Sequence, residues 1–174
     1  MIWLGNLLAI AIIVPLTIAA CLDVATRTIP NSVSAIVAVV GVSARLLTGP
    51  SAATVSIAAS LALFVVLLVL HARGMLGGGD VKLIPAIALG LSLPLIGRFI
   101  FITAMAGGVL ALCHLLARWA LRNWRPLRPP PRGAPLLRRV FFAERWRIAR
   151  HGSLPYGVAI ACGGIWVVMS RTGG

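Results

Sequence analysis

The sequence predicts an all-α fold, a polytopic membrane bundle of about six transmembrane helices with both termini outside (N-out/C-out). Of the 174 residues, 60% are hydrophobic and 11% are charged, and the mean hydropathy is +1.02, well outside the range of soluble domains. The apolar residues form runs long enough to cross a bilayer. The basic residues gather on one side of the predicted spans. We expect a single domain over residues 1–174.

Six apolar runs are separated by polar breaks or by breaks that contain Gly and Pro. They cover residues 2–22, 33–48, 51–72, 83–97, 99–118 and 153–170. The fourth run alone is short, about 22 Å at 1.5 Å per residue. Fused with the fifth, it would form a rod of about 54 Å, far longer than a hydrocarbon core of about 30 Å. We therefore predict a chain reversal near Arg98.

The first run ends in a stretch that is similar to a lipoprotein cleavage box, Ile18-Ala19-Ala20-Cys21. However, residues 1–17 contain no Lys or Arg, whereas a secretory signal begins with positive charge. We therefore expect a retained helix. The cysteines show no CxxC spacing, so neither a disulfide framework nor a zinc site is predicted, and no metal or other cofactor is expected.

The basic residues indicate the orientation of the bundle. Ten arginines lie between Arg118 and Arg150, in one long loop at about residues 119–152. With six spans, the side of this loop also receives Arg27, Arg73 and Lys82. The opposite side receives only Arg45, Arg98 and Arg171. This bias predicts that the loop is cytoplasmic. A five-span alternative, with runs four and five fused, is disfavoured because it would place the loop opposite Arg27 and Arg73.

The long basic loop divides into two parts. Its first part contains Pro129-Pro130-Pro131, which forbids a continuous helix. From Leu136 to Arg150, apolar residues are mixed with arginines, which predicts a short helix in the headgroup layer with Glu144 paired inside it. Beside a membrane, such a loop favours anionic lipid headgroups as partner over nucleic acid, so no nucleic-acid partner is expected.

Only three acidic residues occur in the chain, and two of them lie at predicted span ends. Asp23 directly follows the first run and Asp80 directly precedes the fourth, so both fall on the cytoplasmic face. Ionisable groups at the edge of the hydrocarbon are costly unless paired or functional. Two carboxyls in a partly dry site share a proton, and such a dyad can activate a water for attack on a peptide carbonyl.

The residues around each aspartate favour a site but also allow a simpler interpretation. Gly77, Gly78 and Gly79 precede Asp80 and predict an irregular loop that a substrate backbone can approach. Alternatively, the glycines form a turn and Asp80 caps the next helix. Asp23 is followed within eight residues by polar and turn-forming residues, Thr26, Arg27, Pro30 and Asn31. Alternatively, this is an ordinary turn in which Arg27 neutralises Asp23.

Two motifs together resemble a known family. Asp23-x-x-Thr26-x-x-Ile29-Pro30-Asn31, followed by Gly77-x-Gly79-Asp80-x-Lys82, is similar to the signature of the type IV prepilin peptidases, the GxGD membrane aspartic proteases. Leu154-Pro155-Tyr156-Gly157 also resembles that family. The resemblance implies that Asp23 and Asp80 are catalytic. It also implies that the site is shaped by Thr26, Pro30, Asn31, Gly77, Gly78, Gly79 and Lys82.

The resemblance further implies the substrate. A prepilin leader peptide would be cut at the cytoplasmic face of the bacterial inner membrane. Larger members carry paired cysteines in an N-terminal cytoplasmic segment and often methylate the trimmed pilin. Because those cysteines are absent here, methyltransferase activity is not expected, and the short form resembles the stand-alone peptidases of tight-adherence (Flp) pili.

Two other functions compete with leader removal. A non-enzymatic membrane subunit or small ion or proton transporter could use Asp23 and Asp80, but it would tend to bury charge near mid-membrane rather than at helix ends. A GxGD protease of the signal-peptide-peptidase kind would share the chemistry but cut inside a transmembrane helix. The position of the cut distinguishes it from leader removal.

Overall fold

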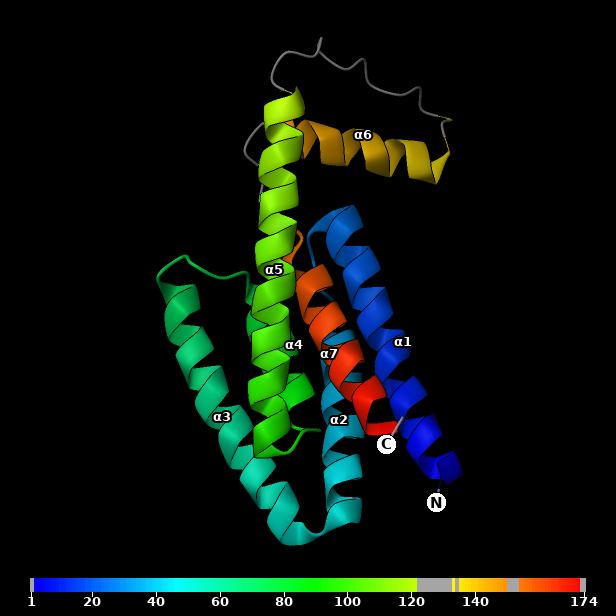
Figure 1. The fold of residues 1–174 in the computed structure, drawn as a ribbon, viewed down its shortest axis with the longest axis vertical. Helices are drawn as coiled ribbons and strands as arrows, with labels where there is room; N and C mark the ends of the chain where they lie inside the picture. The colour runs from blue at the N-terminus through cyan, green and yellow to red at the C-terminus, as the bar shows by residue number, and fades with distance from the viewer. Residues whose placement is uncertain (1, 122–132, 134, 150–153, 173–174) are drawn as a thin grey trace.

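The computed structural model describes residues 2–121, 133, 135–149 and 154–172, and within them every regular element is a helix (Figure 1). The helices are α1 (Ile2–Thr26), α2 (Asn31–Thr48), α3 (Pro50–Ala72), α4 (Gly78–Ala88), α5 (Leu93–Leu121), α6 (Leu136–Ala149) and α7 (Tyr156–Thr172). The all-α prediction is therefore confirmed for the described residues. The proline-rich stretch predicted to be irregular, residues 122–132, lies outside them.

Apolar side chains both fill the bundle and cover its outside. The largest fully buried side chains belong to Phe99, Leu16, Leu83, Leu91, Ile160, Val37 and Val167. Large apolar side chains are also exposed on the outer helix faces, among them those of Leu7, Val39, Leu61, Phe101, Met105 and Trp166. Helices that are apolar all round suit a lipid environment, because lipid replaces water around the bundle. The protein is a multi-pass membrane protein.

Four helices are long and apolar enough to cross a membrane, and their spans cover Leu7–Thr26, Asn31–Thr48, Pro50–Ala72 and Leu93–Ala120. A shorter apolar helix covers Tyr156–Ser170. With 11 residues, α4 is about 16 Å long, about half of a hydrocarbon core. The six-span count therefore stays a prediction.

The predicted reversal near Arg98 is wrong. The chain turns at residues 89–92, and Arg98 lies inside α5. Buried serines of α3 hold this turn: Ser60 Oγ donates to the Pro85 carbonyl at 2.7 Å, and Ser56 Oγ donates to the Leu91 carbonyl at 2.8 Å. Pro94 follows in the first turn of α5, where a missing N–H costs nothing.

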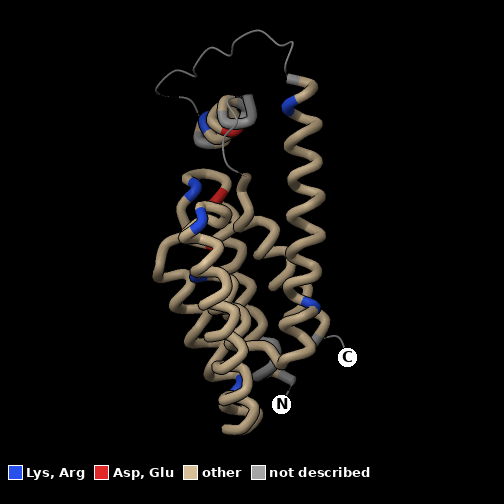
Figure 2. Tube along the Cα trace, turned by 90° about the vertical axis from the view of Figure 1, so that its left-hand side faces the viewer, with Lys and Arg blue, Asp and Glu red and all other residues tan. Residues whose placement is uncertain are grey.

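The helices α1, α2 and α3 alternate in direction, so the C-terminal end of α1 and the N-terminal end of α4 lie at the same end of the bundle (Figure 1). The predicted basic helix is confirmed as α6, which lies across this end, whereas the N-terminal end of α1 and the C-terminal end of α7 lie at the other (Figure 1). All acidic residues of the chain occupy the end beneath or within α6 (Figure 2). The cytoplasmic location of this end stays a prediction.

Glycines allow the helices to approach closely. A Cβ on Gly41 of α2 would lie 2.8 Å from the backbone nitrogen of Gly90, at the turn after α4. A Cβ on Gly164 would lie 2.8 Å from Leu16. The paired glycines of α5 differ, because a Cβ on Gly107 would contact Tyr156 at 2.6 Å, whereas one on Gly108 would meet nothing within 4 Å.

Candidate active site

Asp23 lies in the last turn of α1 and is only 7% exposed. The helix ends three residues later because Arg27 adopts a left-handed backbone conformation, with φ of 58°. In that conformation the Arg27 N–H donates to the carbonyl of Asp23 at 3.0 Å, a common way to close a helix. The end of α1 thus fixes the backbone of Asp23 at the boundary between a membrane span and the segment that follows it.

Asp80 lies in the first turn of α4. The prediction of an irregular loop through Gly77, Gly78 and Gly79 is wrong, because α4 begins at Gly78 and only Gly77 lies before it. Glycine in a helix costs conformational entropy relative to alanine, and α4 carries this cost in its first turn. The glycines also let neighbours approach: a Cβ on Gly79 would lie 3.1 Å from Ile29, and one on Gly77 would lie 3.0 Å from the Asp80 carboxylate.

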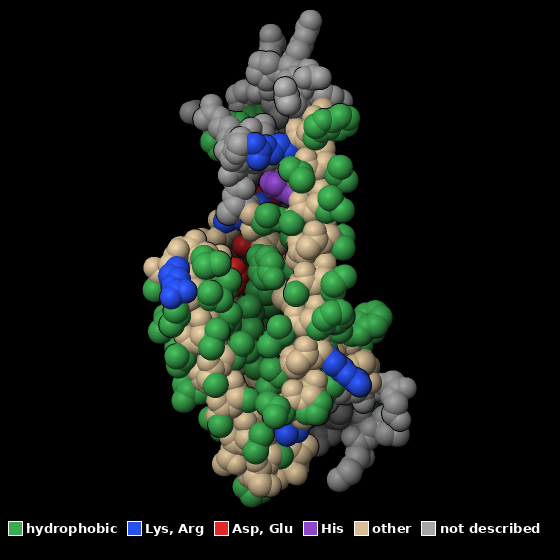
Figure 3. Space-filling view, turned by 60° about the vertical axis from the view of Figure 1, so that its left-hand side comes forward, with side chains coloured by type: hydrophobic (Ala, Val, Ile, Leu, Met, Phe, Trp, Pro, Cys, Tyr) green, Lys and Arg blue, Asp and Glu red, His purple; other side chains and the backbone are tan. Residues whose placement is uncertain are grey.

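Both aspartates line one cavity of about 720 Å³ at this end of the bundle. Its walls come from the end of α1 and the residues after it, the segment before α4 with the first turn of α4, and the beginning of α7. They include Arg27, Met75, Tyr156 and the three glycines Gly77, Gly78 and Gly79. In the space-filling view, acidic atoms are visible in a hollow surrounded by apolar side chains (Figure 3). A partly enclosed, largely apolar cavity with two converging carboxyls is a typical catalytic or binding site.

The environment of Asp80 keeps its carboxyl protonated in mildly acidic solution. Asp80 lies outside the four long spans. Its partial burial and, to a smaller extent, the negative charge of Asp23 raise the pKa of Asp80 to about 6. A hydrogen bond with the Gly77 backbone lowers this pKa but does not outweigh them. Because the charge of one aspartate affects the other, the two carboxyls form an interacting pair.

The first turn of α7 holds the carboxylate of Asp23. The backbone N–H of Gly157 donates to Asp23 Oδ2 at 2.8 Å. A Cβ on Gly157 would lie 2.9 Å from both Cβ and Oδ2 of Asp23, so only glycine permits this approach. Neither contact follows from the spacing in the sequence, although residues 154–157 already resemble a family motif.

The other residues predicted to shape the site, Thr26, Pro30, Asn31 and Lys82, do not line the cavity and lie beside it. Lys82 Nζ donates to Asn31 Oδ1 at 2.9 Å, which ties α4 to the start of α2. Lys82 instead lines a separate apolar groove between α2, α3 and α4. Thr26 Oγ1 donates to the Leu22 carbonyl at 2.8 Å, within α1. Pro30 is the residue before α2, with an extended backbone at φ of −61°.

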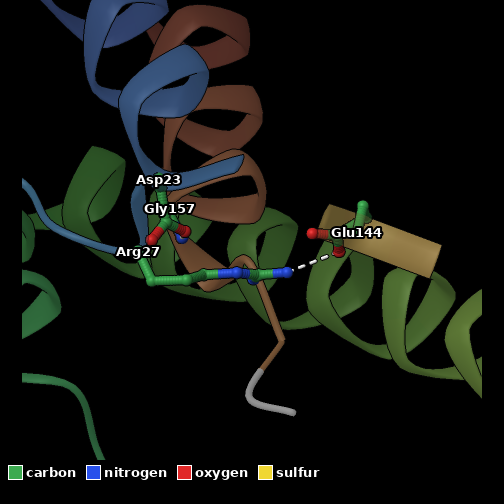
Figure 4. A network of polar contacts seen from close by, with 4 residues as sticks. All are labelled: Asp23, Arg27, Glu144 and Gly157. Carbon is green, nitrogen blue, oxygen red and sulfur yellow. Dashed lines mark hydrogen bonds and ion pairs between the residues drawn. The ribbon is translucent and has the colours of Figure 1, made fainter. Parts of the chain in front are cut away.

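Glu144 connects α6 to the cavity. Arg27 extends from the end of α1 toward α6, where its Nη2 donates to Glu144 Oε1 (Figure 4). The sequence predicted a partner for Glu144 inside its own helix and did not reveal this ion pair. One feature of the sequence could have indicated the pair. A buried arginine needs an anion, and the chain contains only three acidic residues that could supply one.

The fold and the cavity define a multi-pass membrane protein with a paired-carboxyl site at one end of its bundle. Residues 10–112, more than half of the chain, match the type IV leader peptidase family, and the chain belongs to this family. It is therefore a membrane protease of the prepilin-peptidase class. The matched residues include both aspartates and exclude α6 and α7. No curated protein and no solved structure matches the chain.

Proposed function

We propose that this protein is an aspartic endopeptidase that removes the leader peptide of Flp-type prepilins at the cytoplasmic face of the bacterial inner membrane, with Asp23 and Asp80 as its catalytic pair. The observation that carries the proposal is that these two carboxyls, 57 positions apart in the sequence, line one cavity. Membership of the type IV leader peptidase family supports the reaction class.

The two aspartates take different parts in the proposed reaction. Asp80, with its pKa raised to about 6, is the member that holds the shared proton. Asp23 accepts a hydrogen bond from Gly157 and acts as the base. It takes a proton from a water, the resulting hydroxide attacks the scissile carbonyl, and Asp80 donates its proton to the developing oxyanion. Collapse of the tetrahedral intermediate, with a proton passed to the leaving amine, releases the two products.

The substrate reaches the site from the membrane boundary. The apolar segment of a prepilin would lie in the bilayer beside the bundle, and its leader would lie at the end covered by α6. The arginines of α6 and its exposed Leu137, Phe141 and Trp146 suit contact with anionic headgroups. We assign this helix to lipid rather than to the basic leader, because like charges repel.

The proposal is tested by Asp23→Asn and Asp80→Asn in cells that co-express a Flp-type prepilin. Each variant should accumulate uncut precursor on a gel, because a single carboxyl cannot serve as both base and acid. Arg98→Gln, a charge removal at an exposed position of α5, is the matched control and should process normally. If both aspartate variants cut the precursor at the wild-type rate, the dyad is refuted.

Mass spectrometry of the product separates leader removal from cutting inside a transmembrane helix. A cut before the apolar segment supports a leader peptidase, and a cut within it supports the signal-peptide-peptidase kind of reaction. Reporter fusions after residues 73 and 172 test the orientation. The first should be cytoplasmic and the second external in the six-span arrangement.

A further inference from the structure

The ion pair between Arg27 and Glu144 brings a charge from outside the family-matched region to the catalytic cavity. Arg27 lines that cavity together with both aspartates. Its side chain is 13% exposed and that of Glu144 is 21% exposed, so the pair is largely removed from water. Within the described residues, Nε and Nη1 of Arg27 are buried without a hydrogen-bond partner. Glu144 therefore contributes strongly to holding this cation.

The other charged and titratable groups around the dyad come from several helices. Among the described side chains they are Tyr156 in the cavity lining, His71 beside Gly78, Lys82 two residues after Asp80 and, beyond Arg27, Glu144 of α6. Lys82 is bound to Asn31, and His71 Nδ1 lies 2.8 Å from the Leu76 carbonyl. Among the described residues that line the cavity, Arg27 is the only lysine or arginine.

We propose that Glu144 is a positioning residue for the reaction: it holds the Arg27 guanidinium on the α6 side of the cavity and so keeps that cation from pairing with the dyad carboxylates. This inference rests on the proposed function of Asp23 and Asp80. Figure 4 shows the geometry on which it stands, with the Arg27 side chain directed toward Glu144 of α6 and the Asp23 carboxylate beside the backbone of Gly157.

The reason is electrostatic. A dyad works only while it carries one proton, and a nearby cation favours the state in which both carboxyls are ionised. An arginine with two unsatisfied buried donors would gain hydrogen bonds by turning to a carboxylate. Glu144 both supplies an alternative acceptor and cancels the positive charge of Arg27. Without it, the shared proton would be lost at a lower pH.

The test is the pH dependence of kcat/KM for cleavage of a Flp-type prepilin by the full chain in nanodiscs. Glu144→Gln should move the whole bell-shaped profile to lower pH, by about one unit. Glu144→Asp retains the charge and should keep the wild-type profile. Arg138→Gln, at an exposed position of the same helix, should also leave the profile in place.

A double variant shows whether Glu144 acts through Arg27. Arg27→Gln with Glu144→Gln should have the same profile as Arg27→Gln alone, because the cation that Glu144 positions is gone. The inference is overturned if Glu144→Gln leaves the profile unchanged, lowers the rate equally at every pH, or still shifts the profile in the Arg27→Gln background. These results differ from failure of the dyad itself, which would appear as cleavage by Asp23→Asn and Asp80→Asn.

Discussion

The backbone N–H of Gly157 donates to Oδ2 of Asp23 at 2.8 Å, across 134 positions of sequence. This hydrogen bond joins the first turn of α7 to the last turn of α1, two helices that pack along each other. The last apolar helix therefore helps to orient the carboxylate of Asp23 directly, although it lies outside the residues matched to the family.

Gly157→Ala should lower prepilin cleavage about a hundredfold, because the new methyl group would lie 2.9 Å from Asp23 Oδ2 and would push the carboxylate from its position. The measurement is the initial cleavage rate of the reconstituted protein. Gly108→Ala is the matched control, since a methyl group there meets nothing within 4 Å. Equal rates for the two variants would contradict the role assigned to the Gly157 hydrogen bond.

The stability of the fold should depend on pH through the protonation of Asp80. Its pKa is about 6 in the folded protein and 3.8 for a free side chain, so between these values the folded state binds more protons than the unfolded state. Stability from this group is complete below about pH 4 and is lost as the pH rises to about 6. The Tm of the wild type in detergent should fall relative to that of Asp80→Asn across this window. A relative rise would exclude a raised pKa at Asp80.

Lys82→Met should reduce cleavage by less than about threefold, because Lys82 does not line the cavity that holds Asp23 and Asp80, and its ammonium group binds Asn31. A double-mutant cycle with Asn31→Ala, read from denaturant unfolding, should give a coupling energy of about 1 kcal/mol. A loss of cleavage as large as that of Asp80→Asn would instead assign Lys82 a direct part in the reaction.

Gly41→Ala should destabilise the fold by about 1–3 kcal/mol, since its methyl group would lie 2.8 Å from the Gly90 nitrogen and would force α2 away from the turn after α4. Gly97→Ala is the control, because its site is open and a helix gains about 0.5–1 kcal/mol from alanine in place of glycine. The two substitutions should shift the Tm in opposite directions. A shift in the same direction would contradict the close contact.

The sequence predicts the helical class and the pairing of the aspartates because both follow from local rules. Apolar runs of sufficient length specify the membrane helices, and an odd number of spans between Asp23 and Asp80 would separate them to opposite faces. The two runs between them return the chain to the same end, and the cavity lined by both aspartates agrees with this prediction.

The remaining features depend on contacts between distant segments. The turn before α5 lies at residues 89–92, where Ser56 and Ser60 of α3 bond the carbonyls of Leu91 and Pro85, and not near Arg98, so local sequence misplaces it. Gly78 and Gly79 begin α4 against their low helix propensity, and Ile29 from a distant segment packs against Gly79 there. The partner of Glu144 likewise depends on how α6 crosses the bundle.

Arg27 has two separate roles, one for its left-handed backbone and one for its side chain. The main chain must bend there to finish the first membrane helix just beyond Asp23, and the side chain must carry a cation to α6. Glycine at this position would preserve the bend and remove the cation, whereas a β-branched residue would oppose the bend itself. Substitutions at position 27 can therefore change the end of α1 and the charge beside Asp23 and Asp80 independently.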